Sequence, residues 1–133
     1  FVEDIVSASS IIVRGEGEAE SYSALLRESI EKFYPEKKII WNPQGEEEAD
    51  LCLAVSITGK EKLTMDSISR VVFAGGKADV ISANPQSLIS KAATNAIQVS
   101  DELFFKGDEH ILGKFSILAV IEILTVLMGK DKV

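Results

Sequence analysis

Apolar positions along the chain fall into short continuous runs and into longer stretches with helical spacing. "SIIVRG" (residues 10–15) is rich in β-branched residues and predicts a strand. Residues 18–34, "EAESYSALLRESIEKFY", carry a stripe with a spacing of three and four, which predicts an amphipathic helix that Pro35 ends. The stripe consists of Tyr22, Leu25, Leu26, Ser29, Ile30 and Phe33.

Further runs continue this alternation. "KKIIWNP" (37–43) and "KADVISA" (77–83) predict strands, and "QGEEEAD" (44–50) predicts a solvated acidic loop. "LCLAVSIT" (51–58) has the continuous apolar character of a strand buried on both faces. "MDSISRVVFA" (65–74) fits either a strand or a short helix, and we expect a strand.

Two helices are expected in the last third of the chain. Residues 84–104 begin with Asn84 as an N-cap and Pro85 at the first helical position, and the pattern continues as one helix. "FSILAVIEILTVLMG" (115–129) is apolar almost all round and ends at Gly129. A helix of this kind is enclosed in a core or shared with another subunit, and in so small a domain we expect a homodimer contact.

Strands that alternate with helices predict a single α/β domain over residues 1–133. We expect three layers, with a mixed or mostly parallel sheet and helices on both of its faces. Ligands of such sheets bind beyond the carboxyl ends of the strands. The turns that follow strands are therefore the first places to examine for a site.

Composition narrows the choice of partners. The chain has 133 residues, 46% of them hydrophobic, and a net charge of −7, which disfavours nucleic acid and acidic membranes and favours a small ligand or a protein. Cys52 is the only cysteine, so a disulfide framework is excluded and a reducing cytoplasm fits. "SILAVIEILTVLMG" (116–129) is too short to span a bilayer and carries Glu122, so we expect no membrane segment.

The turn "RGEGEAES" (14–21) is the first candidate site. Gly15 and Gly17 allow backbone N–H groups to face an anion at the start of a helix, and Glu16 would then hold a divalent cation beside it. The segment lacks the third glycine of a dinucleotide fingerprint and the lysine of a P-loop. A plain turn from strand to helix accounts for the same letters.

Two other turns offer ligand groups after strands. "SITGKEK" (56–62) places Thr58 and Lys60 beside a flexible glycine, a combination that holds phosphate or makes an ordinary tight turn. "ISANPQS" (81–87) offers Ser82 and Asn84 to a ligand, or uses them for helix capping.

The segment "KGDEHILGKFS" (106–116) gathers diverse chemistry before the last helix. Its only histidine, His110, is a candidate base, Asp108 a candidate metal ligand and Lys114 a candidate phosphate ligand, although a lone histidine in a polar loop is more often a surface residue. The glycine and lysine spacing does not match a P-loop. The sequence contains no recognisable Ser-His-Asp set and no pair of metal-ligating histidines. Phosphoryl or nucleotidyl transfer is the reaction class that needs the least covalent help from side chains, so it fits best.

The layout "IIVRGEGEAESYSALLRESIEKFYPEKKIIW" and the ending "GDEHILGKFSILAVIEIL" resemble the inosine-triphosphate pyrophosphatase-like fold. Within it, the chain is similar to the methanogen guanylyltransferases that join GTP to a pyridinol during biosynthesis of the iron-guanylylpyridinol cofactor. The resemblance implies GTP, a heterocyclic hydroxyl acceptor, Mg²⁺ and a homodimer. Pyrophosphatases usually carry Asn and Lys where this chain has "GEGEAE", which argues against simple pyrophosphatase activity.

The resulting hypothesis is a nucleotidyltransferase that releases pyrophosphate. Lys60 or Lys114 would hold phosphates, and Glu16 or Asp108 would hold the cation. The alternatives are a nucleoside-triphosphate pyrophosphatase and a non-enzymatic dimeric binding module.

Overall fold

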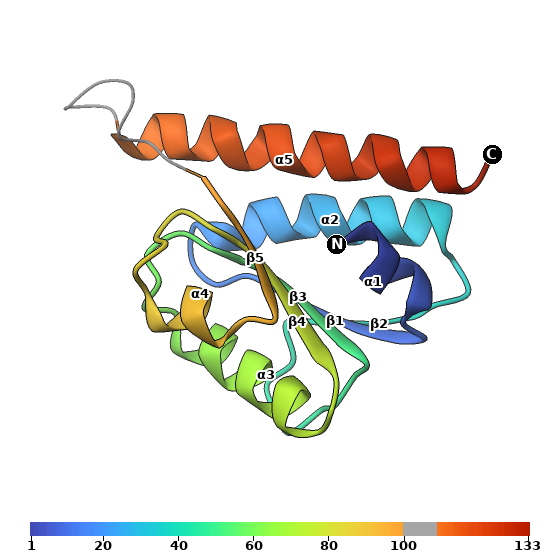
Figure 1. Ribbon diagram of the computed structural model, residues 1–133, viewed down its shortest axis with the longest axis horizontal. Coiled ribbons are helices and arrows are strands. Elements are labelled where there is room, and N and C mark those ends of the chain that lie inside the picture. The colour runs from blue at the N-terminus through green and yellow to red at the C-terminus, as the bar shows by residue number, and fades with distance from the viewer. Residues whose placement is uncertain (100–108) are drawn as a thin grey trace.

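A computed structural model describes residues 1–99 and 109–133 of the chain, with side chains described through residue 99 and from residue 115 (Figure 1). These residues form five strands and five helices, which alternate except where the third strand follows the second directly. In chain order they are α1 (Val2–Ser7), β1 (Ser10–Arg14), α2 (Ala19–Phe33), β2 (Lys38–Trp41), β3 (Leu51–Ser56), α3 (Lys62–Phe73), β4 (Lys77–Ser82), α4 (Leu88–Ala92), β5 (Asn95–Gln98) and α5 (Glu109–Asp131).

The strands form one sheet in the order β2-β1-β3-β4-β5, and all four neighbouring pairs are parallel. β3 lies at the centre, and each of its six residues is buried, as the continuous apolar run predicts. The predicted α/β class with helices on both faces is confirmed, and the sheet is parallel throughout the described residues.

Each face of the sheet is covered by its own group of helices. α1, α2 and α5 lie on one face, with Leu26 and Ile30 of α2 buried against the sheet (Figure 1). α3 and α4 cover the other face, where Ile68, Val71 and Ile89 pack on Cys52 and its neighbours. Side chains alternate between the faces along each strand, so consecutive residues of β1 contribute to different halves of the core.

The strand expected at residues 65–74 is wrong, because this segment belongs to helix α3. Its buried residues are Thr64, Ser67, Ile68 and Val71, which follow one another at helical spacing. Two of the four are polar, so hydrophobicity alone did not show the helical period. Contact with the sheet decides the conformation here.

The continuous helix expected at residues 84–104 is also wrong. Within residues 84–99 the helical part is the short α4, and its N-cap is Ser87, whose hydroxyl accepts the Ser90 N–H, instead of Asn84. The chain leaves the helix at Ala93 and pairs with β4 as strand β5. Pairing with an open sheet edge outweighs the helical preference of this alanine-containing segment.

Helix α5 lies along α2 and extends beyond both ends of the predicted segment 115–129 (Figure 1). One stripe, made of Ile117, Ile121, Leu124 and Met128, is buried in the core. The opposite side remains exposed, so α5 is only partly enclosed. None of the described helices has the length and apolar character that a membrane span requires.

Candidate ligand-binding site at the carboxyl edge of the sheet

Most of the predicted site residues lie where parallel strands end. The loops after β1, β3 and β4 meet at the carboxyl edge of the sheet and carry Gly15, Glu16, Gly17, Thr58, Lys60, Ser82 and Asn84. Asp108 lies outside the described residues. His110 and Lys114 fall in the first turns of α5, at positions whose side chains are not described.

Local packing explains both glycines of the turn after β1. A Cβ atom at Gly15 would lie 2.3 Å from Ser23 Oγ, and the Gly15 N–H donates to Asn42 Oδ1 at 2.9 Å. Gly17 has a φ of 59°, in the left-handed region that favours glycine. A turn from strand to helix therefore explains both glycines without a ligand, and anion binding at Gly15 and Gly17 stays a prediction.

Glu16 connects the turn after β1 to the start of α3. Its Oε1 accepts the backbone N–H of Thr64 at 2.5 Å, which satisfies a donor at a helix start that would otherwise lack a partner. Among the side chains of residues 1–99 and 115–133, no three of the metal-ligating types lie together. The prediction of Mg²⁺ at Glu16 or Asp108 stays a prediction.

The loop after β3 forms a small anion-binding concavity, and the chain itself fills it. The carboxylate of Glu61, the N-cap residue of α3, accepts backbone N–H groups from Ile57 at 2.9 Å, Thr58 at 3.2 Å and Gly59 at 3.0 Å. The Ser56 hydroxyl donates to the same carboxylate at 2.8 Å. Successive N–H groups of this kind, at a helix N-terminus, bind anions in many folds. We call this group of four donors the β3 nest.

The β3 nest holds Glu61 in its ionised form. Burial alone would raise the pKa of Glu61, but hydrogen bonds from the Ser56 hydroxyl and from the Ile57 and Thr58 N–H groups outweigh burial and lower the pKa. An ionised carboxylate with its oxygens already occupied is a weak base. Its role is to accept the hydrogen bonds of the backbone N–H groups in the loop after β3.

The loops after β3 and β4 are joined by hydrogen bonds. Asn84 Nδ2 donates to the Thr58 carbonyl oxygen at 2.9 Å, and buried Ser82 accepts the Ser90 hydroxyl at 2.6 Å. A Cβ at Gly59 would lie 2.3 Å from Ser87 Cβ, so the two loops also touch closely. Lys60 is exposed beside them. Hence Ser82 belongs to an internal network, whereas Thr58 and Lys60 lie at the surface of the edge.

Sequence reasoning missed two residues of this region. Glu61 reads as part of a solvated loop, and only the fold shows its hydrogen bonds. Arg14 ends an apolar strand and is 2% exposed, and its Nε has no hydrogen-bond partner. A charged residue that continues a buried apolar run was the available signal.

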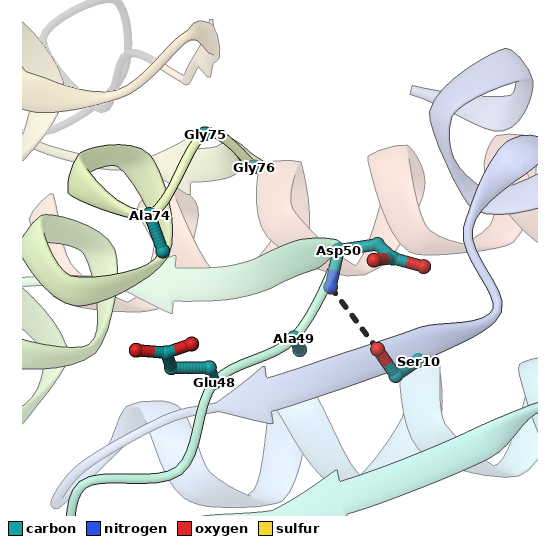
Figure 2. Close-up of a pocket in the computed structure, with 7 residues that line it drawn as sticks. All are labelled: Ser10, Glu48, Ala49, Asp50, Ala74, Gly75 and Gly76. Carbon is teal, nitrogen blue, oxygen red and sulfur yellow. Dashed lines mark hydrogen bonds between the residues drawn. The ribbon is translucent and has the colours of Figure 1, made fainter.

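A second cavity, of about 360 Å³, lies at the opposite, amino edge of the sheet (Figure 2). Its lining consists of Ser10, Glu48, Ala49, Asp50, Ala74, Gly75 and Gly76. The Asp50 N–H donates to Ser10 Oγ at 3.1 Å, the bond drawn in Figure 2. The cavity also faces the end of α3, where backbone carbonyls give a partial negative charge. With two carboxylates in addition, this cavity is poorly suited to an anion.

Comparison with known proteins gives a fold but no sequence family. The chain matches no protein-family model and no curated protein by sequence. The sugar isomerase domain of an RpiR transcription factor from Sphaerobacter thermophilus superposes over 98% of the chain with a TM-score of 0.81 and 17% identity. The chain has the fold of sugar isomerase (SIS) domains.

Other SIS-fold structures agree. Vibrio vulnificus NanR in complex with ManNAc-6P matches 98% of the chain with a TM-score of 0.78 and 17% identity. A Methanococcus jannaschii protein, for which a 3-hexulose-6-phosphate isomerase function has been inferred, matches 98% with a TM-score of 0.70 and 12% identity. The chain spans 52% of the length of NanR and about three quarters of the other two structures.

These matches correct the family resemblance. The inosine-triphosphate pyrophosphatase-like assignment and the similarity to guanylyltransferases are wrong, because the sheet and its helices superpose on SIS domains. The predicted GTP-dependent transferase, with a pyridinol acceptor in cofactor biosynthesis, rested on that assignment and is wrong with it. A strand, a glycine turn and a helix occur in many parallel α/β folds, so this layout could not distinguish them.

Proposed function

We propose that this chain binds a phosphorylated sugar, with the ligand at the carboxyl edge of the sheet. The observation that carries the proposal is the carboxyl edge of an SIS fold, where the ends of parallel strands and the loops after them bring polar groups together. NanR, a structure of the same fold, contains ManNAc-6P. The surface groups Thr58 and Lys60 beside the nest supply further donors for hydroxyl and phosphate oxygens.

The chemistry of the site favours binding over isomerisation. Aldose–ketose interconversion needs a base that removes a proton beside a carbonyl group. Two carboxylates of this edge, Glu16 and Glu61, already accept backbone N–H groups, and the pKa of Glu61 is lowered. These hydrogen bonds make both groups poor candidates for such a base. A domain that senses a sugar phosphate needs no such group.

Calorimetric titration tests this function. N-acetylmannosamine 6-phosphate, glucose 6-phosphate and fructose 6-phosphate would each be compared with the unphosphorylated sugar. We expect binding that depends on the phosphate, and no interconversion of the hexose phosphates when the mixture is followed by NMR. Failure of every sugar phosphate to bind would refute the proposed function, and turnover would replace sensing by catalysis.

We also propose that the exposed side of α5 contacts a second copy of the chain. Phe115, Ile123 and Leu127 are 62%, 58% and 44% exposed. Ile123 and Leu127 line an apolar cavity of about 490 Å³ that also includes Phe1, Val2, Glu3, Ile97, Val120 and Leu124. Exposed apolar surface of this kind commonly marks an interface.

Light scattering with size-exclusion chromatography checks the contact. Ile123→Glu should give a folded monomer if the wild type is a dimer. The equivalent change at Leu124 would be uninformative, because Leu124 is only 4% exposed and its replacement would disrupt the core. A monomeric wild type, or an unchanged dimer in Ile123→Glu, contradicts the contact.

A further inference from the structure

A cavity separate from the β3 nest lies between the loop after β2 and helix α3. Its volume is about 260 Å³, slightly below the range typical of drug-sized ligand pockets. The end of β1 forms its base, and the loop and α3 form its walls. The lining residues are Arg14, Pro43, Gln44, Gly45, Glu46, Glu47, Leu63, Asp66, Ser67 and Arg70. We call this the Arg14 cavity.

Arg14 is the unusual member of the lining. It is 2% exposed, and its buried Nε has no hydrogen-bond partner. Guanidinium stays protonated at any ordinary pH, so burial without a partner carries a cost that neutralisation cannot relieve. An anion in the cavity would pair with the guanidinium charge through the part of Arg14 that lines the cavity. This unpartnered group is evidence for a ligand that is independent of the cavity's shape.

The fold holds Arg14 rigidly in this position. Ile12 packs in the core beneath α3, and Arg14 projects to the same face because side chains two apart in a strand share a face. β1 is flanked by β2 and β3, with Val13 paired to both Trp41 and Leu53. A binding group on a central strand is placed more accurately than one on a loop.

The rim of the cavity determines which anion fits. Arg70 lies 3.9 Å from Glu46, with 45% and 84% of the two side chains exposed, so this ion pair contributes little. Glu47 and Asp66 add two more carboxylates around Ser67. A ligand with anionic groups at more than one position would be repelled here. A ligand with one anionic end and hydroxyl groups along its length would place the anion on Arg14. Its hydroxyl groups would donate hydrogen bonds to the rim carboxylates.

The β3 nest and the Arg14 cavity therefore differ in whether their donor groups are free to bind a ligand. The four donors of the nest are occupied by Glu61, whereas Arg14 lacks an acceptor. We infer that the Arg14 cavity is a binding site for the anionic group of a small sugar ligand, with Arg14 as the anion-binding residue. The sugar character of the ligand rests on the proposed function, whereas anion binding by Arg14 does not.

Titrations with matched probes test the inference. Glucose 6-phosphate offers a phosphate, glucuronate a carboxylate and glucose neither group, and inorganic phosphate tests the anion alone. We expect glucose to bind at least tenfold more weakly than the better of the two anionic sugars. The ¹⁵N-resolved signal of the Arg14 side-chain N–H should shift when that ligand is added.

Variants connect the binding to Arg14. Arg14→Met should weaken binding of the anionic sugar at least tenfold, and it should fold, because an apolar side chain replaces an unpaired buried charge. Arg14→Lys should retain part of the affinity, since it keeps the charge but not the fork of donors. Arg27→Met removes an arginine of α2 that does not line the cavity and that forms an ion pair with Glu31, and it should bind as the wild type does.

The outcomes separate this inference from the proposed function. Unchanged binding of glucose 6-phosphate in Arg14→Met, with tighter binding in Glu61→Ser, would place the phosphate in the nest and overturn the inference while the function stands. Arg14-dependent binding of inorganic phosphate, with no affinity for any sugar ligand, would support the anion site and refute the function. Absence of any anion binding to the wild type would overturn both.

Discussion

Glu61 at the carboxyl edge and Asp79 toward the amino edge are both withdrawn from water, yet their pKa values move in opposite directions. The β3 nest lowers the pKa of Glu61. Burial and a hydrogen bond with Asp4 raise the pKa of Asp79 to about 7. Asp79 is fully buried, and its described donor is Asn95 Nδ2 at 3.0 Å.

The difference shows that the hydrogen-bond donors around a buried carboxyl group determine whether it is ionised or protonated. At the carboxyl edge the backbone turns into a helix N-terminus, and several N–H groups converge on one point. Toward the amino edge, Asp4 of α1 approaches Asp79, which helps to raise the pKa of Asp79 and lowers that of Asp4. The same sheet thus stabilises an anion at one end and a protonated acid at the other.

The largest expected effect is the pH dependence caused by Asp79. A pKa of about 7 in the folded state, against 3.8 for the free side chain, means that the folded state binds more protons between these values. Stability should therefore fall as pH rises from about 4 to about 7, by at most about 4 kcal/mol for three pKa units. The lowered pKa of Asp4 affects stability only below about pH 3.8, so it does not offset this fall.

Urea unfolding at pH 4.5, 6 and 8 measures this fall in the free energy of unfolding. Asp79→Asn should remove most of the fall and be more stable than the wild type at pH 8. Asp66→Asn, at an exposed position of α3, is the matched control and should keep the wild-type profile. Parallel pH profiles for Asp79→Asn and the wild type would show that Asp79 is not the protonated group.

Two glycines, one at each edge of the sheet, allow the packing of the two edges to be compared. Gly59 at the carboxyl edge has a φ of 78° and Gly75 at the amino edge a φ of 96°, so alanine is strained at both. A Cβ at Gly59 would also collide with Ser87, whereas a Cβ at Gly75 meets nothing within 4 Å. Gly75→Ala should cost about 1–2 kcal/mol, and Gly59→Ala about 3 kcal/mol or more once overpacking is added.

Chemical denaturation of both variants checks this pair. A larger loss for Gly59→Ala would confirm that the loops after β3 and β4 are in close contact. Equal losses would mean that the loops separate at little cost, and the carboxyl edge would then be the more adaptable of the two.

The smallest expected effect comes from Glu61. Glu61→Gln should lower stability by about 1–2 kcal/mol at pH 7, because one acceptor oxygen becomes a donor that faces other donors. Since the folded pKa of Glu61 is lowered, the stabilising contribution is present above the unfolded value and is lost as pH falls through the folded one. The difference between variant and wild type should therefore shrink in acid.

Thermal denaturation from pH 3 to pH 7 measures this difference. Glu28→Gln, on the exposed side of α2, is the control and should change little. If Glu61→Gln equals the control at pH 7, the nest does not hold an anion, and the contrast with Asp79 fails.

The sequence by itself determined the elements whose hydrophobic period is strong. β1, β3 and α2 follow from the runs at residues 10–15 and 51–58 and the stripe at 18–34, and the carboxyl edge follows from the parallel class. Local preference and burial agree in these segments, so one pattern suffices.

Only the tertiary structure decided the rest. α3 has two polar residues on its buried stripe, and β5 forms because an open strand edge was available, so neither element is legible from hydrophobic period alone. The strand order depends on pairing between segments far apart in the sequence. The sequence gives no sign of the hydrogen bonds of Glu61, and for Arg14 it shows only a charged residue at the end of an apolar run. The donors that surround one and the missing acceptor beside the other arise from segments that meet only when the chain is folded.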